Sequence, residues 1–231
     1  MSTVEISGKS ARDWLDDVLG LFPQNRLTLD AMRLIPASDV PAPYARLLVH
    51  DHHMTVTLEA HCGGPVALDV LGVRHRGDDY ARKLVLRAGS ASGPIVMVGV
   101  MRFLLQNVRD DVRSEIVAAK TPLGRILISH DVLRRIETKA FLEVSLRSPP
   151  GSLFSAPQAS AFTYGRIAVI FCNGEPAVEL LEIVAPQPPP GSDGALGGDD
   201  VSRDAATDAA TDAATDAASL TVPRDPDPGG V

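Results

Sequence analysis

Residues 66–103 read VALDVLGVRHRGDDYARKLVLRAGSASGPIVMVGVMRF. Three segments rich in Val and Leu alternate in this stretch with short connections of Gly, Ser and Asp. The segments are residues 66–75, 80–87 and 94–103. Connections of this length and composition join neighbouring antiparallel strands. The stretch therefore predicts three consecutive strands that pair antiparallel.

The residues before this stretch favour helices. Ser10 has the character of an N-cap, with Asp13 three positions on and an apolar stripe behind it. A second helix is expected over 44–49. A third is expected to begin after Asp51 and to end at Gly63 and Gly64, because glycine commonly terminates helices.

The residues after it favour two more helices and three more strands. The helices are expected over 109–119 and directly after Thr121; the strands are expected over 132–144, 162–172 and 177–185, with an Asn173-Gly174 turn between the last two. Helices at one end and a run of antiparallel strands indicate an α+β fold. We expect a single antiparallel sheet of about six strands, with N-terminal and inserted helices covering it.

The chain divides by composition into a body, residues 1–186, and a tail, residues 187–231. The tail holds nine acidic and two basic residues, so it carries the whole net charge of −7. It also repeats Asp-Ala-Ala-Thr, a pattern with no large apolar residue to bury, which predicts disorder. The body is neutral and aromatic residues make up 4% of the chain, so a nucleic-acid partner is not expected.

The sequence also leads to expectations about the compartment and the oligomeric state. Cys62 and Cys172 form no CxxC pair, residues 1–9 lack an apolar signal-peptide core, and no apolar run reaches the ~18 residues of a membrane span. We expect a cytoplasmic protein without a membrane span. Cys172, in an apolar strand, is expected to be a small core residue. A monomer or small homo-oligomer is expected.

Two expected helix starts can bind an anion. With Asp51 as N-cap, a backbone amide near Met54 stays free, and the start at Thr121-Pro122 leaves the amides of Leu123 and Gly124 free. Free amides and the helix dipole both favour anions, so two such starts meeting at one pocket would hold a carboxylate. Taken singly, each is an ordinary capped helix.

Arg82 and one of two glutamates are the charged candidates. Strand alternation places Arg82 with Leu84 and Leu86, so it points inward if that face is the core face; otherwise it is a solvated edge residue. Glu179 and Glu182, three apart on a strand, face opposite sides, so at most one faces the core, and periodicity does not choose between them; otherwise both lie on exposed or edge surface. An inward glutamate could exchange a proton with a substrate hydroxyl.

A metal or nucleotide cofactor is not expected. His50, His52 and His53 cluster beside Asp51, but no HExxH motif or second ligand cluster completes a metal site. GxSxG, Walker A and GxGxxG elements are absent from strand–helix contexts in the sequence.

Three ordered segments resemble the bacterial chorismate pyruvate-lyase family. They are the Leu47–Thr55 segment LLVHDHHMT, the Thr121–Arg125 segment TPLGR, and Gly174-Glu175-Pro176 followed by Glu182; an arginine strand lies between the first two. The likeness spans about residues 39–186 and implies an antiparallel sheet whose helices cover a buried ligand. It implies removal of pyruvate from chorismate to leave 4-hydroxybenzoate, without a cofactor.

The same resemblance implies roles for four residues. Met54 and Leu123 would donate backbone amides to the ring carboxylate, Arg82 would be its cationic partner and a catalytic residue, and Glu182 would contact the ring hydroxyl as the catalytic carboxyl group. The alternative is a non-catalytic module of the same fold that binds a small aromatic acid. Tyr164-Gly165-Arg166 is assigned a structural role only.

Overall fold

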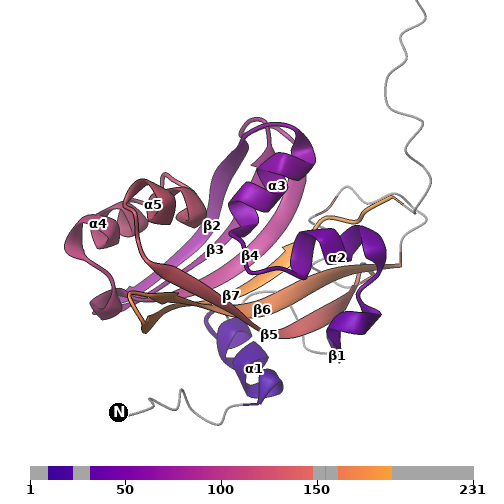
Figure 1. Cartoon of the computed structure of the whole chain (residues 1–231), viewed down its shortest axis with the longest axis horizontal. Helices are drawn as coiled ribbons and strands as arrows, with labels where there is room; N and C mark the ends of the chain where they lie inside the picture. The colour runs from indigo at the N-terminus through magenta and orange to yellow at the C-terminus, as the bar shows by residue number, and fades with distance from the viewer. Residues whose placement is uncertain (1–9, 23–31, 148–153, 155–160, 189–231) are drawn as a thin grey trace, which may run out of the picture. The chain divides into compact units, whose positions relative to one another are not determined.

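The structure is a computed structural model that describes residues 10–22, 32–147, 154 and 161–188. Its described strands form one antiparallel sheet in the order β1-β5-β6-β7-β4-β3-β2 (Figure 1). The strands are β1 (Met32–Ile35), β2 (Val66–Arg76), β3 (Asp79–Ala88), β4 (Ile95–Leu104), β5 (Arg134–Ser145), β6 (Phe162–Cys172) and β7 (Glu175–Val184). The chain therefore builds two antiparallel groups, β2–β4 and β5–β7, which meet where β4 pairs with β7.

Helices cover both faces of the sheet (Figure 1). They are α1 (Ala11–Gly20), α2 (Ala42–Leu48), α3 (Met54–Cys62), α4 (Asp110–Ala118) and α5 (Leu123–Ser129), with short 3-10 turns η2 (Ala37–Asp39) and η3 (Leu105–Asn107). Helices α2 to α5 pack on one face and bury the larger apolar cluster. Helix α1 packs on the other face and buries a second cluster with Trp14 and Val18. Because both faces are covered, the central strands are apolar on both sides.

The predicted α+β class and single antiparallel sheet are confirmed, but the strand number was wrong. The described sheet has seven strands where about six were expected. The strand missed is β1, which has four residues, pairs only with β5 at the sheet edge and buries only its two ends. Four residues with that pattern show no period-two alternation, so the sequence carries no strand signal there.

Most local predictions agree with the structure. Ser10 caps α1 and forms a reciprocal capping box with Asp13. Gly63 ends α3 in the left-handed conformation, at φ 68°. The β6–β7 turn places Asn173 and Gly174 at φ 52° and 92°, the conformation that a two-residue hairpin turn requires.

Two further predictions concern the tail and the chain's environment. The tail for which disorder was predicted, residues 187–231, lies outside the described residues except for Gln187 and Pro188. Gln187 donates its backbone amide to the Tyr44 hydroxyl at 3.0 Å. Among the described residues, no helix is long and apolar enough to cross a membrane.

Candidate functional site

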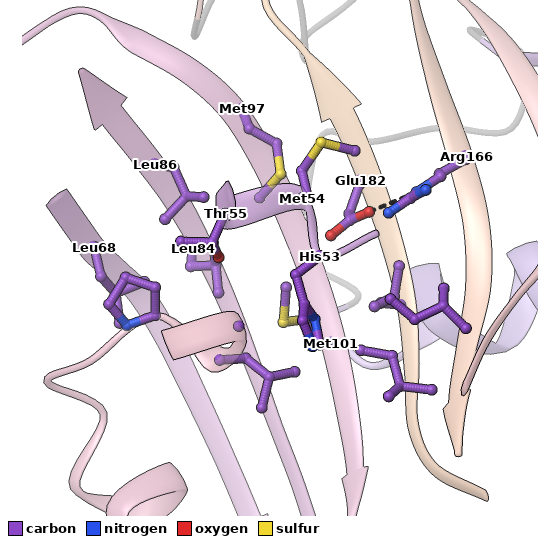
Figure 2. Close-up of a pocket in the computed structure, with 16 residues that line it drawn as sticks. His53, Met54, Thr55, Leu68, Leu84, Leu86, Met97, Met101, Arg166 and Glu182 are labelled. Carbon is purple, nitrogen blue, oxygen red and sulfur yellow. Dashed lines mark hydrogen bonds and ion pairs between the residues drawn. The ribbon is translucent and has the colours of Figure 1, made fainter. Parts of the chain in front are cut away.

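A buried cavity lies between the sheet and the first residues of α3 and α5 (Figure 2). Its floor comes from β2 to β7 and includes Leu84, Met97, Met101 and Leu180. The volume of the cavity is about 20 Å³, which is room for about one water molecule. A ring-sized ligand therefore has to displace side chains. Methionines suit this, because their unbranched chains adopt several rotamers at small cost.

Helices α3 and α5 begin side by side above this cavity. Met54 and Leu123 are their first residues, and both line the cavity. Gly124 permits the approach, because a Cβ there would lie 2.9 Å from Thr55 Oγ1 and 3.1 Å from His53 Cβ. The two helix starts therefore meet at one cavity, which is the condition that the sequence analysis set for a carboxylate site.

The predicted cap residues of both helices were wrong. The N-cap of α3 is His53, not Asp51, and the N-cap of α5 is Pro122, not Thr121. Neither residue makes a side-chain capping bond. The side chain of Asp51 is 82% exposed, so it stays in water, and the first amides of α3 remain unused by a cap.

Glu182 faces the cavity, and its partner is Arg166. The two residues stand directly opposite each other on β7 and β6. Arg166 Nε donates to Glu182 Oε2 at 2.8 Å, and both side chains are buried (Figure 2). A buried carboxylate is stable only when a charge or several donors compensate it. The pair therefore leaves Glu182 Oε1 as the oxygen for a ligand, at one end of the cavity.

Arg166 also holds the segment that leads into α3. Its Nη1 donates to the carbonyl oxygens of Leu48 and His50 at 3.2 and 2.9 Å, and its Nη2 donates to that of His52 at 3.4 Å. One guanidinium thus joins the 48–52 segment to the Glu182 carboxylate. The fork of donors in arginine suits this role, whereas a lysine could not span the same acceptors.

Glu179 lies on the opposite face of the sheet. Arg102 Nη1 approaches Glu179 Oε2 at 3.8 Å on the side that α1 covers. Glu182 shares its face with Leu180, which lines the cavity. The structure therefore selects Glu182, the choice that periodicity left open.

Arg82 points inward, as alternation predicted for a core-facing β3. It is fully buried, and its guanidinium carbon lies 5.0 Å from the centre of the Phe103 ring. Its Nη1 donates to Ile116 O at a long 3.4 Å, while Nε and Nη2 have no hydrogen-bond partner among the described residues. Burial lowers the pKa of Arg82, and the Tyr80 phenol offsets part of that effect. Arg82 is not one of the described cavity-lining residues; it lies two residues before Leu84, on the same face of β3.

Gly99 lies on β4 between these two charged positions. In register, Leu84 on β3 faces Gly99 on β4, and Gly99 faces Glu182 on β7. A Cβ at Gly99 would come within 3.3 Å of both Leu84 and Met97. The absence of a side chain at Gly99 therefore lets the Leu84 and Met97 side chains pack closely over β4.

His53 contributes a neutral imidazole to the cavity wall. It is 7% exposed, and its Nε2 is buried without a hydrogen-bond partner among the described residues. Its pKa is lowered to about 4, by burial first and then by the positive charges of Arg134 and Arg166. The ring is therefore uncharged near neutral pH and can accept or donate one hydrogen bond at Nε2, depending on its tautomer.

The other histidines of the cluster are occupied by backbone groups or solvent. His50 Nδ1 accepts from the His52 amide at 3.1 Å, so His50 Nε2 carries the proton and donates to Leu47 O at 2.8 Å. Burial and Arg166 lower the pKa of His50. In the described ranges, no group of three or more His, Cys, Asp or Glu side chains could hold a metal ion.

Sequence reasoning underrated Arg166 and His53. Alternation back from Ile170, which lines the cavity, would have placed Arg166 on the same face. For His53 the available signal was its position directly before Met54, at a helix start. The four expected site residues and these two surround one region of the sheet, with Arg82 at its edge.

Comparison with known proteins adds no relative. No protein-family model matches the chain, and no curated protein matches it in sequence. What the fold and site define is an α+β protein with a buried cavity lined by an ion pair and a neutral histidine, and with a buried arginine, Arg82, beyond the lining residues on the same face of β3. Those groups determine which ligands the cavity can bind.

Proposed function

We propose that the protein is a chorismate pyruvate-lyase, which eliminates pyruvate from chorismate to give 4-hydroxybenzoate. The observation that carries this proposal is Arg82, a fully buried guanidinium with two unpartnered nitrogens in the described part of the chain. A buried cation without a counter-charge is costly. A ligand carboxylate would accept two parallel hydrogen bonds from those nitrogens.

The distance to Glu182 suits a ring with polar groups at both ends. Arg82 faces Met101 across the β3–β4 pair, and Glu182 lies two strands away and two residues along. Strand spacings put the two Cα atoms roughly 12 Å apart. Side chains reaching inward from each position would bracket one six-membered ring. The ring carboxylate would meet Arg82 and the amides of Met54 and Leu123, and the ring hydroxyl would meet Glu182.

The reaction needs orientation and one proton transfer. The ether bond between ring C3 and the enolpyruvyl oxygen breaks, the C4 proton leaves, and its electron pair completes the aromatic ring. The departing enolpyruvate takes up a proton and becomes pyruvate. Glu182 Oε1 would accept the proton beside the ring hydroxyl, a role that typically contributes about 10²–10⁴-fold. Aromatisation supplies driving force, so the protein mainly positions the substrate.

The test is to incubate the protein with chorismate and measure 4-hydroxybenzoate and pyruvate together. Equimolar products are expected, with turnover reduced about 10²-fold or more by Arg82→Ala and by Glu182→Gln. Matched controls are Lys83→Ala and Glu179→Gln, whose strand positions face away from the cavity side. Folded Arg82 and Glu182 variants with unchanged turnover would refute the assignment.

One observation favours a second candidate, a module that binds an aromatic acid without converting it. Glu182 already accepts a hydrogen bond from Arg166, so half of its carboxylate is engaged. In a binding protein that pair would simply orient Oε1 toward a ligand hydroxyl. Tight binding of 4-hydroxybenzoate by the wild-type protein, without turnover of chorismate, would establish this candidate in place of the enzyme.

A further inference from the structure

The buried cavity adjoins an open groove, and His53 stands between them. His53 and Ile136 line both spaces. The groove has a volume of about 580 Å³, which lies within the range of about 300–1,000 Å³ for small-molecule sites. The two spaces therefore share a wall at His53 and Ile136, and the groove is the more open of the two.

Two arginines of β5 border the groove, and they differ in orientation. Arg134 shares a strand face with the cavity-lining Ile136, and its charge acts on His53. Its Nη1 donates to Val132 O at 3.2 Å, and no ion pair joins it to a described residue. Arg135 faces the other way, paired with Glu137 and placed 4.1 Å from the centre of the Phe171 ring.

The potential at His53 Nε2 is therefore positive and suits an anion. Arg134 and Arg166 both disfavour a proton on the ring, and the same potential favours a negatively charged ligand group. Asp51 also borders the groove, but its side chain is 82% exposed and its charge is not among those that shift the pKa of His53. His53 Nε2, which is buried without a hydrogen-bond partner among the described residues, and Arg134 can therefore bind an anionic group of a ligand.

We infer that His53 and Arg134 form a subsite for a second carboxylate, one carried on a side arm of the ring that the cavity holds. This inference rests on the proposed function and identifies the group: in chorismate it is the enolpyruvyl carboxylate. Arg82 and Arg134 then hold the two carboxylates from opposite ends. The arm lies past His53 in the groove, so pyruvate leaves through the groove while the ring stays in the cavity.

Two stable ligands separate the subsite from the cavity. The probes are 3-(carboxymethoxy)-4-hydroxybenzoate, which carries the second carboxylate, and 3-methoxy-4-hydroxybenzoate, which lacks it. Dissociation constants are measured by calorimetry on the whole chain. The wild-type protein should bind the dicarboxylate about 10-fold more tightly, the value of one charge-assisted hydrogen bond. Arg134→Ala and His53→Ala should each remove most of that preference, and Arg135→Ala should keep it.

The outcomes distinguish a failure of the carboxylate subsite from a failure of the proposed function. Equal binding of both probes by the wild-type protein would overturn the subsite and leave the proposed function standing. A preference that survives both Arg134→Ala and His53→Ala would also overturn it. Binding of neither probe would overturn both claims together. Arg134 is exposed, so Arg134→Ala removes no core contact, whereas His53→Ala removes a buried ring and its fold is checked by urea unfolding.

Discussion

Replacing Arg166 with methionine should destabilise the protein strongly at neutral pH. The guanidinium is 1% exposed and pairs with a Glu182 carboxylate that is 4% exposed. Methionine fills a similar volume but leaves the carboxylate buried without a cation. Breaking a buried pair in this way costs about 3–5 kcal/mol. That is a large part of the ~5–15 kcal/mol by which domains are stable.

The segment before α3 adds a smaller cost. Arg166 also donates to carbonyl oxygens of Leu48, His50 and His52. His52 is exposed and His50 only half-buried, so water can replace part of those bonds. Each lost bond there should add less than about 1 kcal/mol. The carboxylate, not the segment, should dominate the total.

Urea unfolding at neutral pH measures the effect, and a second substitution isolates its cause. In the Arg166→Met background, Glu182→Gln replaces a buried charge with a neutral amide and should recover about 1–3 kcal/mol. In the wild-type background the same substitution should destabilise, because it leaves the guanidinium without its anion. The sign of the Glu182→Gln effect should therefore reverse between backgrounds.

A second cross-strand pair provides the matched control. Arg33 and Glu143 also stand directly opposite each other, on β1 and β5, and join at 3.0 Å. The Arg33 side chain is 67% exposed, so Arg33→Met should cost no more than about 1 kcal/mol. Equal losses for Arg33→Met and Arg166→Met, or an additive double mutant at Glu182, would refute the reasoning from burial.

Two further predictions concern α4 and α5. His130 contacts Glu115 and Asp111, and hydrogen bonds to these two carboxylates raise its pKa in the folded state. The stabilisation by His130 is therefore complete below the ordinary histidine pKa of about 6.5, and it is lost as pH rises through the higher folded pKa. The difference in unfolding free energy between wild type and His130→Gln should shrink across that interval, and a difference that grows with pH would contradict the assignment. Gly124→Ala should lower the unfolding free energy by about 1–3 kcal/mol, because its Cβ would meet Thr55 Oγ1 at 2.9 Å; an unchanged urea midpoint would show that α3 and α5 do not pack this closely.

Local chemistry explains what the sequence predicted well. The Gly-containing connections predicted the hairpins, and Ser10 with Asp13 predicted the start of α1, because these signals act within a few residues. Alternation also placed Arg82 on the same face as Leu84, but the fold decided that this face is buried. The meeting of α3 and α5 was an expectation from free helix starts, but the close contact at Gly124 is a tertiary fact.

The identity of the buried glutamate shows where sequence reasoning stops. The Asn173-Gly174 turn alone pairs Cys172 with Glu175, a register that would set Arg166 opposite Leu181. The structure instead inserts one extra residue of β7 after Pro176, and Glu182 comes to face Arg166. Pro176 has no amide to offer the ladder, which suits a bulge at this point.

The sequence by itself determined six of the seven described strands, the hairpin turns and the α+β class, because each follows from periodicity and turn chemistry along the chain. Tertiary structure alone decided which charges meet. Arg166 and Glu182 are sixteen residues apart, and Arg166 and the 48–52 segment more than a hundred. A one-residue shift in a strand reverses the face of every side chain after it. The register of β6 and β7 therefore decides that Glu182 lines the cavity.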